Sequence, residues 1–172
     1  MAEEFLTLMA DLDEDTQSCM SGWYDKLKEA GFSGVQTPGL PFHISMATFP
    51  LDKEEEAISV MQNAARKFSP VSVHISHIGI FAGGKVLFGA PERDEALNVL
   101  HDACRSDSPQ PYPWTPHVTV MIDKPQVICA ALPVLLQSFT PIVGKITRLH
   151  LCAFWPTREI MTVELKGEPN GT

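Results

Sequence analysis

A histidine and a hydroxyl residue stand two positions apart at two distant places, His43 with Ser45 and His117 with Thr119. In a β-strand, residues i and i+2 point to the same face, so each histidine would share a face with its hydroxyl. Because imidazole titrates near neutral pH, one histidine can remove a proton while the other delivers one. The hydroxyls can donate hydrogen bonds to phosphate oxygens, where negative charge develops. Two such strands facing each other could therefore cleave a phosphodiester without a metal ion.

The pattern alone is not specific, because the chain holds a third copy, His74 with Ser76. A single histidine among apolar residues of a strand is more often a hydrogen-bonded structural residue than a catalytic one. The functional interpretation therefore depends on the elements that carry each copy and on their relation to one another.

Hydrophobic periodicity and turn residues predict these elements. Asp13 is the expected N-cap of the first helix, and Pro133 is expected to kink the last helix or break it in two. Strands are expected over 4–10, 71–81, 86–88, 142–154 and 159–165, and helices over 14–30, 53–68, 92–105 and 126–138. The first His strand is expected between the loop 34–41 and Pro50, and the second is expected after the loop 108–116.

The order of strand, helix and hairpin occurs twice, and the two copies align. The segment 68–71 (Phe-Ser-Pro-Val) matches 139–142 (Phe-Thr-Pro-Ile) at an offset of 71 residues. After each segment the apolar residues change phase at the same place, which predicts a β-bulge in both copies. The alignment places the His43 and His117 motifs at equivalent strands, whereas His74 aligns with Lys145. We therefore interpret the His74 copy as accidental.

A duplicated unit with one His-x-Ser/Thr strand per half resembles the 2H phosphoesterase superfamily, which includes 2′-5′ RNA ligase-like proteins and cyclic nucleotide phosphodiesterases. The resemblance covers 4–166 and includes Pro-Phe-His43-Ile-Ser45-Met, Pro-His117-Val-Thr119-Val and the hairpin around 79–88. It implies an α+β, duplicated bilobal fold, with two antiparallel sheets facing a central cleft and helices on the outside. We expect one domain over 1–166, with repeats at about 41–91 and 115–166 and a flexible tail over 167–172.

The resemblance also implies the roles of the motif residues. His43 and His117 would be the catalytic acid–base pair, and Ser45 and Thr119 would bind the phosphate. The expected substrate is a 2′,3′-cyclic or 2′-5′ phosphodiester of a nucleotide or RNA end, cleaved or joined without a cofactor or metal. Strand phase further suggests that Phe81, Arg148 and His150 face the cleft, where Phe81 could stack a base and Arg148 could bind phosphate; a core Phe81 and a solvated Arg148 are the alternatives. Phe49, just past the first motif, could line the pocket, but packing in the core is favoured for it.

Composition limits the partners of the chain. The net charge of −8 argues against binding of long nucleic acid, which needs clustered Lys and Arg, but allows a small nucleotide in a local pocket. No segment of 18 apolar residues predicts a membrane span, and no basic signal region opens the sequence. Four scattered cysteines without a Cys-x-x-Cys pair fit reduced thiols in a cytoplasmic protein. We expect a cytoplasmic monomer that does not bind membranes.

Two other functions remain open from the sequence. The cleft could hold a nucleotide such as AMP without turnover, as a binding module. The chain could also act as a partner in RNA processing, although the sequence shows no basic stripe that would favour this. The exact substrate, the position of the product phosphate and the assignment of acid and base to the two histidines do not follow from the sequence.

Overall fold

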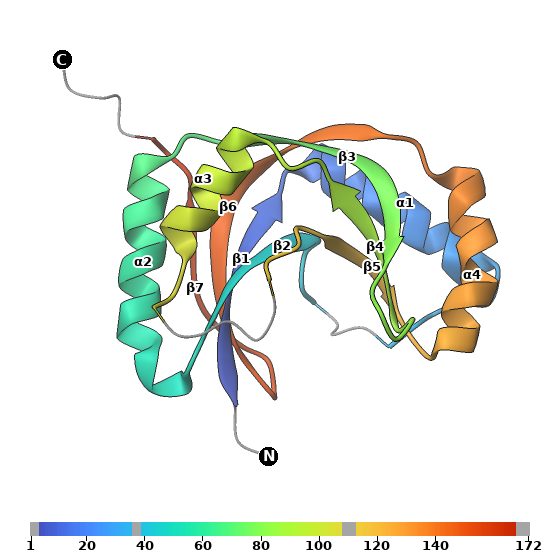
Figure 1. Ribbon diagram of the computed structural model, residues 1–172, viewed down its shortest axis with the longest axis horizontal. Coiled ribbons are helices and arrows are strands. Elements are labelled where there is room, and N and C mark those ends of the chain that lie inside the picture. Colours follow the sequence, from blue (N-terminus) through green and yellow to red (C-terminus); the bar gives the residue numbers. More distant parts are fainter. Residues whose placement is uncertain (1–3, 36–38, 108–112, 168–172) are drawn as a thin grey trace.

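The computed structural model describes residues 4–35, 39–107 and 113–167. Within these ranges helices are interspersed with strands (Figure 1). The strands are β1 (Phe5–Leu12), β2 (His43–Phe49), β3 (Val71–Ile80), β4 (Val86–Pro91), β5 (Val118–Ile122), β6 (Ile142–Phe154) and β7 (Arg158–Glu164). β3 and β4 follow each other directly, as do β6 and β7. The helices are α1 (Glu14–Glu29), α2 (Glu54–Lys67), α3 (Glu95–Cys104) and α4 (Pro125–Ser138), with a short 3-10 helix at Leu51–Lys53.

The strands form one antiparallel sheet in the order β1-β2-β5-β4-β3-β6-β7, and β6 also pairs with β1. The first part of β6 pairs with β3 and the remainder pairs with β1, so this long strand serves both halves of the sheet. The sheet folds over into the halves β2-β1-β6-β7 and β5-β4-β3-β6 (Figure 1). The predicted α+β class is confirmed, but the two halves belong to one continuous sheet rather than to two separate sheets.

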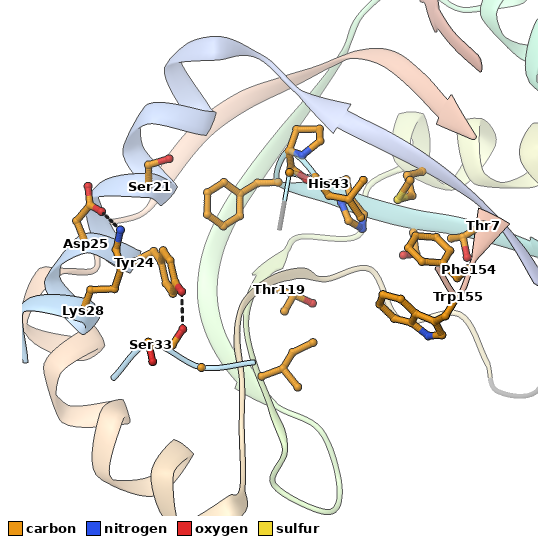
Figure 2. A pocket seen from close by; sticks show the side chains of 18 of the residues that line it. Thr7, Ser21, Tyr24, Asp25, Lys28, Ser33, His43, Thr119, Phe154 and Trp155 are labelled. Atoms are coloured by element: carbon orange, nitrogen blue, oxygen red, sulfur yellow. Dashed lines mark hydrogen bonds and ion pairs between the residues drawn. The ribbon is translucent and has the colours of Figure 1, made fainter. Parts of the chain in front are cut away.

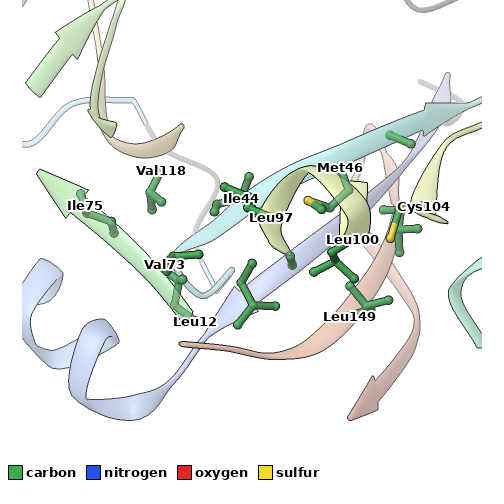
Figure 3. Close-up of a cluster of buried hydrophobic side chains, with 14 of the residues drawn as sticks. Leu12, Ile44, Met46, Val73, Ile75, Leu97, Leu100, Cys104, Val118 and Leu149 are labelled. Carbon is green, nitrogen blue, oxygen red and sulfur yellow. The ribbon is translucent and has the colours of Figure 1, made fainter. Parts of the chain in front are cut away.

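The helices cover the outer faces of the two halves. α2 packs on β1, β6 and β7, and α1 packs on β5 and β6, while α3 lies beside α2 and α4 lies beside α1. Figure 3 shows apolar side chains from both halves meeting in one buried cluster, with Ile44 and Met46 of β2 near Leu97 and Leu100 of α3. The core therefore fixes the two motif strands from behind.

Local sequence explains the ends of the helices. The Asp13 side chain accepts a hydrogen bond from the Thr16 backbone N–H at 2.9 Å, so it caps α1 as predicted. Gly31 follows α1 with φ of +90°, a conformation that favours glycine. α4 runs through Pro133 to Ser138, so the predicted alternative of two separate helical pieces is wrong.

The predicted bulges lie at equivalent positions. In β3 the pairing with β4 skips Ser76, and in β6 the pairing with β1 skips Thr147, 71 residues further on. Each bulge reverses which residues of its strand face the core, as the change of apolar phase indicated. β1 lies between β2 and β6 as β4 lies between β5 and β3.

The domain and repeat boundaries themselves stay predictions. The predicted tail, 167–172, lies outside the described residues from 168 onward. Among the helices of the described ranges, none is both long enough and apolar enough to cross a membrane.

Candidate active site

The two motif strands lie next to each other in the sheet. β2 begins at His43, His117 immediately precedes β5, and the two strands pair at Ile44 and Val118. Residues directly opposite each other in an antiparallel pair lie within about 5.5 Å between Cα atoms. The fold therefore brings the two His-x-Ser/Thr motifs, 74 residues apart in the sequence, to one seam between the halves of the sheet.

Both imidazoles are held in the same way. The Nδ1 atom of His43 lies 2.8 Å from the Pro41 carbonyl oxygen, and Nδ1 of His117 lies 2.8 Å from the Thr115 carbonyl oxygen. A carbonyl oxygen can only accept, so Nδ1 carries the proton and donates in each ring. In the neutral rings Nε2 is then the basic nitrogen, and it is the atom that can exchange a proton with a substrate.

Burial tunes both histidines in the same direction. Loss of solvent lowers the pKa of His43 and of His117, while the hydrogen bond to the backbone carbonyl partly raises each pKa. The positive charge of His117 also contributes to lowering the pKa of His43, so the two rings interact electrostatically. Both rings therefore favour the neutral form more than an exposed histidine does.

His43, Ser45 and Thr119 line one cavity of about 740 Å³, within the range typical of small-molecule sites. Figure 2 shows His43 and Thr119 in the middle of this cavity. The labelled residues of α1 and Ser33 stand to one side of them, and Phe154 and Trp155 stand to the other. The cavity thus combines a candidate base or acid with hydroxyls from both motif strands.

The His117 ring is not among the groups that line this cavity, and it lies instead in an aromatic setting. Its ring meets Phe81 edge-on, with centroids 4.7 Å apart, and it meets Phe88 at 5.5 Å. Phe88 lies against Gly79 so closely that a Cβ there would come within 2.3 Å of the phenyl ring. Phe81 thus lies beside the second motif and supports the His117 ring, and its contact with substrate stays a prediction.

Trp114 ties the second motif to the first. Its Nε1–H donates to the Ser45 carbonyl oxygen at 2.9 Å, and its ring stacks on His101 with centroids 3.8 Å apart. The chain just before His117 is thereby attached to the strand that carries His43. The sequence offered no signal for this contact, because it joins residues 69 positions apart.

Phe49 packs in the core, the alternative that the sequence favoured over contact with the cleft. The pairing of β1 with β2 matches Leu8 with Ala47 and Met9 with Ser45, so Met46 is an extra residue in β2. This bulge reverses the alternation after the motif and turns Phe49 into the core, where it is 1% exposed.

A β-bulge also follows the second motif. The pairing of β4 with β5 makes Val120 the extra residue, 74 positions after Met46. Met121 is consequently buried, whereas Ile122, which simple alternation placed on the core face, lines the cavity. Each motif is thus followed by a bulge that changes which side chains reach the cavity.

Arg148 lies away from the cavity that holds His43, so its contact with substrate stays a prediction. β1 lies between β2 and β6, and its Asp11 pairs with His43 of β2 on one side and with Arg148 of β6 on the other. The fully buried Asp11 carboxylate accepts from Arg148 Nε at 2.8 Å. Arg148 lines a separate depression beside Asp13, Glu14 and Glu164 rather than the cavity that holds His43. The Nε–H of Arg148 is thus directed at Asp11 rather than at that cavity.

His150 is likewise buried rather than exposed to substrate. Its Nδ1 lies 3.4 Å from Asp11 Oδ2, and its Nε2 lies 3.3 Å from Cys152 Sγ and 3.5 Å from Glu159 Oε2. The contact with Asp11 is the main cause that raises the pKa of His150 to about 10, with Cys152 adding to it. Asp11 also acts to raise the pKa of His43, against the effect of burial. The sequence analysis missed Asp11, although it continues the alternation of Phe5, Thr7 and Met9 on the cavity face of β1.

Further cavity residues that the sequence did not indicate come from β1, from α1 and the segments that follow it, and from the end of β6. Lys28 and Asp25 of α1 form an ion pair at 2.7 Å, and Trp155 follows β6. Within the part of the chain that the structure describes, no three His, Cys, Asp or Glu side chains are grouped to hold a metal ion.

The fold is similar to those of several solved structures. E. coli LigT, in a crystal structure with 3′-AMP, superposes with a TM-score of 0.65 at 18% identity over 96% of this chain and 99% of LigT. TT0787 of Thermus thermophilus superposes with a TM-score of 0.63 at 15% identity over 96% of this chain and 100% of TT0787. A crystal structure described as a phosphoesterase gives a TM-score of 0.59 at 16% identity, over 94% of this chain and 98% of that one.

The search of curated proteins returned no match. At these identities the structural likenesses establish the fold. The sequence itself matches the model of the 2′-5′ RNA ligase superfamily over residues 18–154, a span that includes both motifs and most of the chain. The chain therefore belongs to the 2′-5′ RNA ligase superfamily.

Proposed function

We propose that this chain is a metal-independent phosphoesterase that cleaves, or in reverse forms, a 2′,3′-cyclic or 2′-5′ phosphodiester of a nucleotide or RNA end. His43 and His117 are the acid–base pair, and Ser45 and Thr119 bind the phosphate. The observation that carries the proposal is the matched anchoring of the two rings, each with Nδ1 bonded to a backbone carbonyl and a hydroxyl two residues further on.

The reaction needs two proton transfers. In hydrolysis of a 2′,3′-cyclic phosphate, the oxygen of a water molecule attacks phosphorus while Nε2 of one neutral histidine removes a proton from that water. The bond from phosphorus to one ribose oxygen breaks, and the second histidine, protonated, gives its Nε2 proton to that leaving oxygen. The product is a phosphomonoester. Hydrogen bonds from Ser45 and Thr119 to the non-bridging oxygens oppose the charge that accumulates in the transition state.

Superfamily membership supports this class of chemistry, and the ligands of a structural relative support the size of the substrate. E. coli LigT has been crystallised with 3′-AMP, phosphate, ATP and NADP+. The cavity of about 740 Å³ is large enough for ligands of this kind.

The test is a panel of 2′,3′-cyclic, 3′,5′-cyclic and 2′-5′-linked nucleotides, with the position of the product phosphate read by NMR. We expect His43→Ala and His117→Ala each to lower kcat by about 10²–10⁴-fold on the cleaved substrate, the usual contribution of one proton transfer. His74→Ala is the matched control, because His74 also precedes a serine by two residues but forms an exposed ion pair with Glu92. Full activity in either motif variant would refute the assignment.

A nucleotide-binding module without turnover is the outcome that competes with this proposal. Isothermal titration with 3′-AMP beside the turnover assay separates the two. Binding without cleavage of any panel substrate would favour the binding module, and salt-sensitive binding of long RNA would favour a role as an RNA-processing partner.

A further inference from the structure

The cavity that holds His43 has an aromatic wall. It is formed by Phe5 at the start of β1 and by Phe154 and Trp155 at the end of β6. Phe5 and Phe154 stack with ring centroids 5.7 Å apart, and Phe154 meets Trp155 edge-on at 5.0 Å. Figure 2 shows the Trp155 ring at the cavity, on the side away from α1, with Thr119 and His43 toward the middle.

Trp155 differs from its two aromatic neighbours in exposure. Phe154 is 6% exposed, whereas Trp155 is 44% exposed and is the one aromatic side chain among the large apolar groups exposed in the described residues. The edge contact with Phe154 supports the ring from one side, while much of the indole remains open to solvent. A flat indole in a ligand cavity offers a surface for a flat ligand group.

The charges of the cavity indicate why such a surface matters. The two oppositely charged side chains that line it, Asp25 and Lys28, form an ion pair with each other at 2.7 Å. The whole chain carries a net charge of −8, so no general positive potential draws a phosphate into the site. The part of the substrate beside the phosphate is then a further source of affinity, in addition to the hydrogen bonds from Ser45 and Thr119. Stacking of one base on an aromatic ring is worth about 1–3 kcal/mol and tolerates any base.

We propose that Trp155 is a base-stacking residue: the nucleobase next to the reacting phosphate lies against its indole ring while Ser45 and Thr119 hold the phosphate. This inference rests on the proposed function and names its substrate as a phosphodiester that carries an aromatic base. Stacking is present before and during the reaction, so it contributes to binding of substrate and transition state alike. Loss of the ring should therefore raise KM and leave kcat nearly unchanged.

The experiment compares two substrates that share the five-membered cyclic phosphate, 2′,3′-cyclic AMP and glycerol 1,2-cyclic phosphate, which has no base. We expect Trp155→Ala to raise KM for cyclic AMP by roughly 5- to 150-fold, the fold-change that one stacked base implies. KM for the glycerol ester should change less than about twofold, because it has no base to lose. Trp155→Phe, which retains a smaller ring, should fall between the wild type and Trp155→Ala.

Binding of 3′-AMP, measured by isothermal titration on the same three proteins, gives a readout that does not need turnover. A wild type that binds 3′-AMP more tightly than Trp155→Ala supports base stacking even if neither cyclic ester is cleaved, a result that would count against the proposed function alone. Equal affinity for 3′-AMP in wild type and Trp155→Ala overturns the inference. So does a KM increase of equal size for the glycerol ester, because it would indicate a general disturbance of the site.

Discussion

The buried pair of Asp11 and His150 should make the stability of the protein depend on pH between neutral and alkaline conditions. His150 is 5% exposed at its side chain and lies 3.4 Å from Asp11 Oδ2. This contact raises its pKa to about 10, well above the value of about 6.5 expected in the unfolded chain. A raised pKa stabilises the fold fully below the unfolded value, and the stabilisation is lost as the pH rises through the folded value.

The size of the effect follows from one proton. Between the two pKa values, the free energy of unfolding should fall by about 1.4 kcal/mol per pH unit. From pH 7 to pH 8.5 the protein should lose about 2 kcal/mol of stability from this pair. Burial also raises the pKa of the Cys104 thiol, to about 12, which destabilises the fold in the same direction at higher pH. The comparison should therefore end at pH 8.5.

Urea unfolding at half-unit steps from pH 6.5 to 8.5 measures this loss in the wild type, in Asp11→Asn and in His150→Gln. Asp11→Asn should lower stability at pH 7, because it leaves Arg148 and His150 without their carboxylate, and its stability should then depend less on pH. His150→Gln removes the titrating group and serves if Asp11→Asn does not fold. Parallel stability curves for all three proteins would refute the assignment of the pH dependence to this pair.

Two further predictions concern the histidines directly. Burial lowers the pKa of both His43 and His117, and the reaction needs one protonated and one neutral ring. The pH profile of kcat/KM should therefore peak below pH 6.5 and fall toward pH 8. A maximum above pH 7 would contradict this. Gly79→Ala places a Cβ within 2.3 Å of the Phe88 ring that supports His117, so thermal unfolding should show a loss of about 1–3 kcal/mol together with lower activity. Gly22→Ala on α1, where nothing lies within 4 Å, is its control and should leave activity intact.

The sequence predicted the parts of the fold that depend on local pattern. The Asp13 cap, the helices and the bulges at Ser76 and Thr147 all follow from capping chemistry and apolar phase. The repeat placed the two motifs at equivalent strands that face each other across a cleft, whereas the structure pairs these two strands in one sheet. These features need only the neighbouring residues, or a comparison of the chain with itself.

The errors arise where one extra residue or one distant partner decides the outcome. The bulge at Met46 shows the same signal as the two predicted bulges, a change of apolar phase from Ile44 and Met46 to Ala47 and Phe49, but that signal was not used for β2. The direction of the Arg148 side chain is set by the Asp11 carboxylate, 137 positions earlier in the chain. Trp155 was missed because a single aromatic residue in a turn gives no periodic signal, and only the cavity around it indicates a binding role.

The strands β1-β2-β5-β4-β3-β6 close on themselves through the pairing of β6 with β1, but neighbouring strands share very different numbers of paired residues. β1 pairs with β6 along its whole length, whereas in the described ranges β2 pairs with β5 only at Ile44 and Val118. The least hydrogen-bonded joint of the sheet is therefore the one that carries both motifs, where Trp114 adds a bond to the Ser45 carbonyl. Backbone pairing is sparse at this joint, where local opening costs least. In the function proposed above, a phosphate held by Ser45 on one side and Thr119 on the other would bridge the joint and stabilise its paired state.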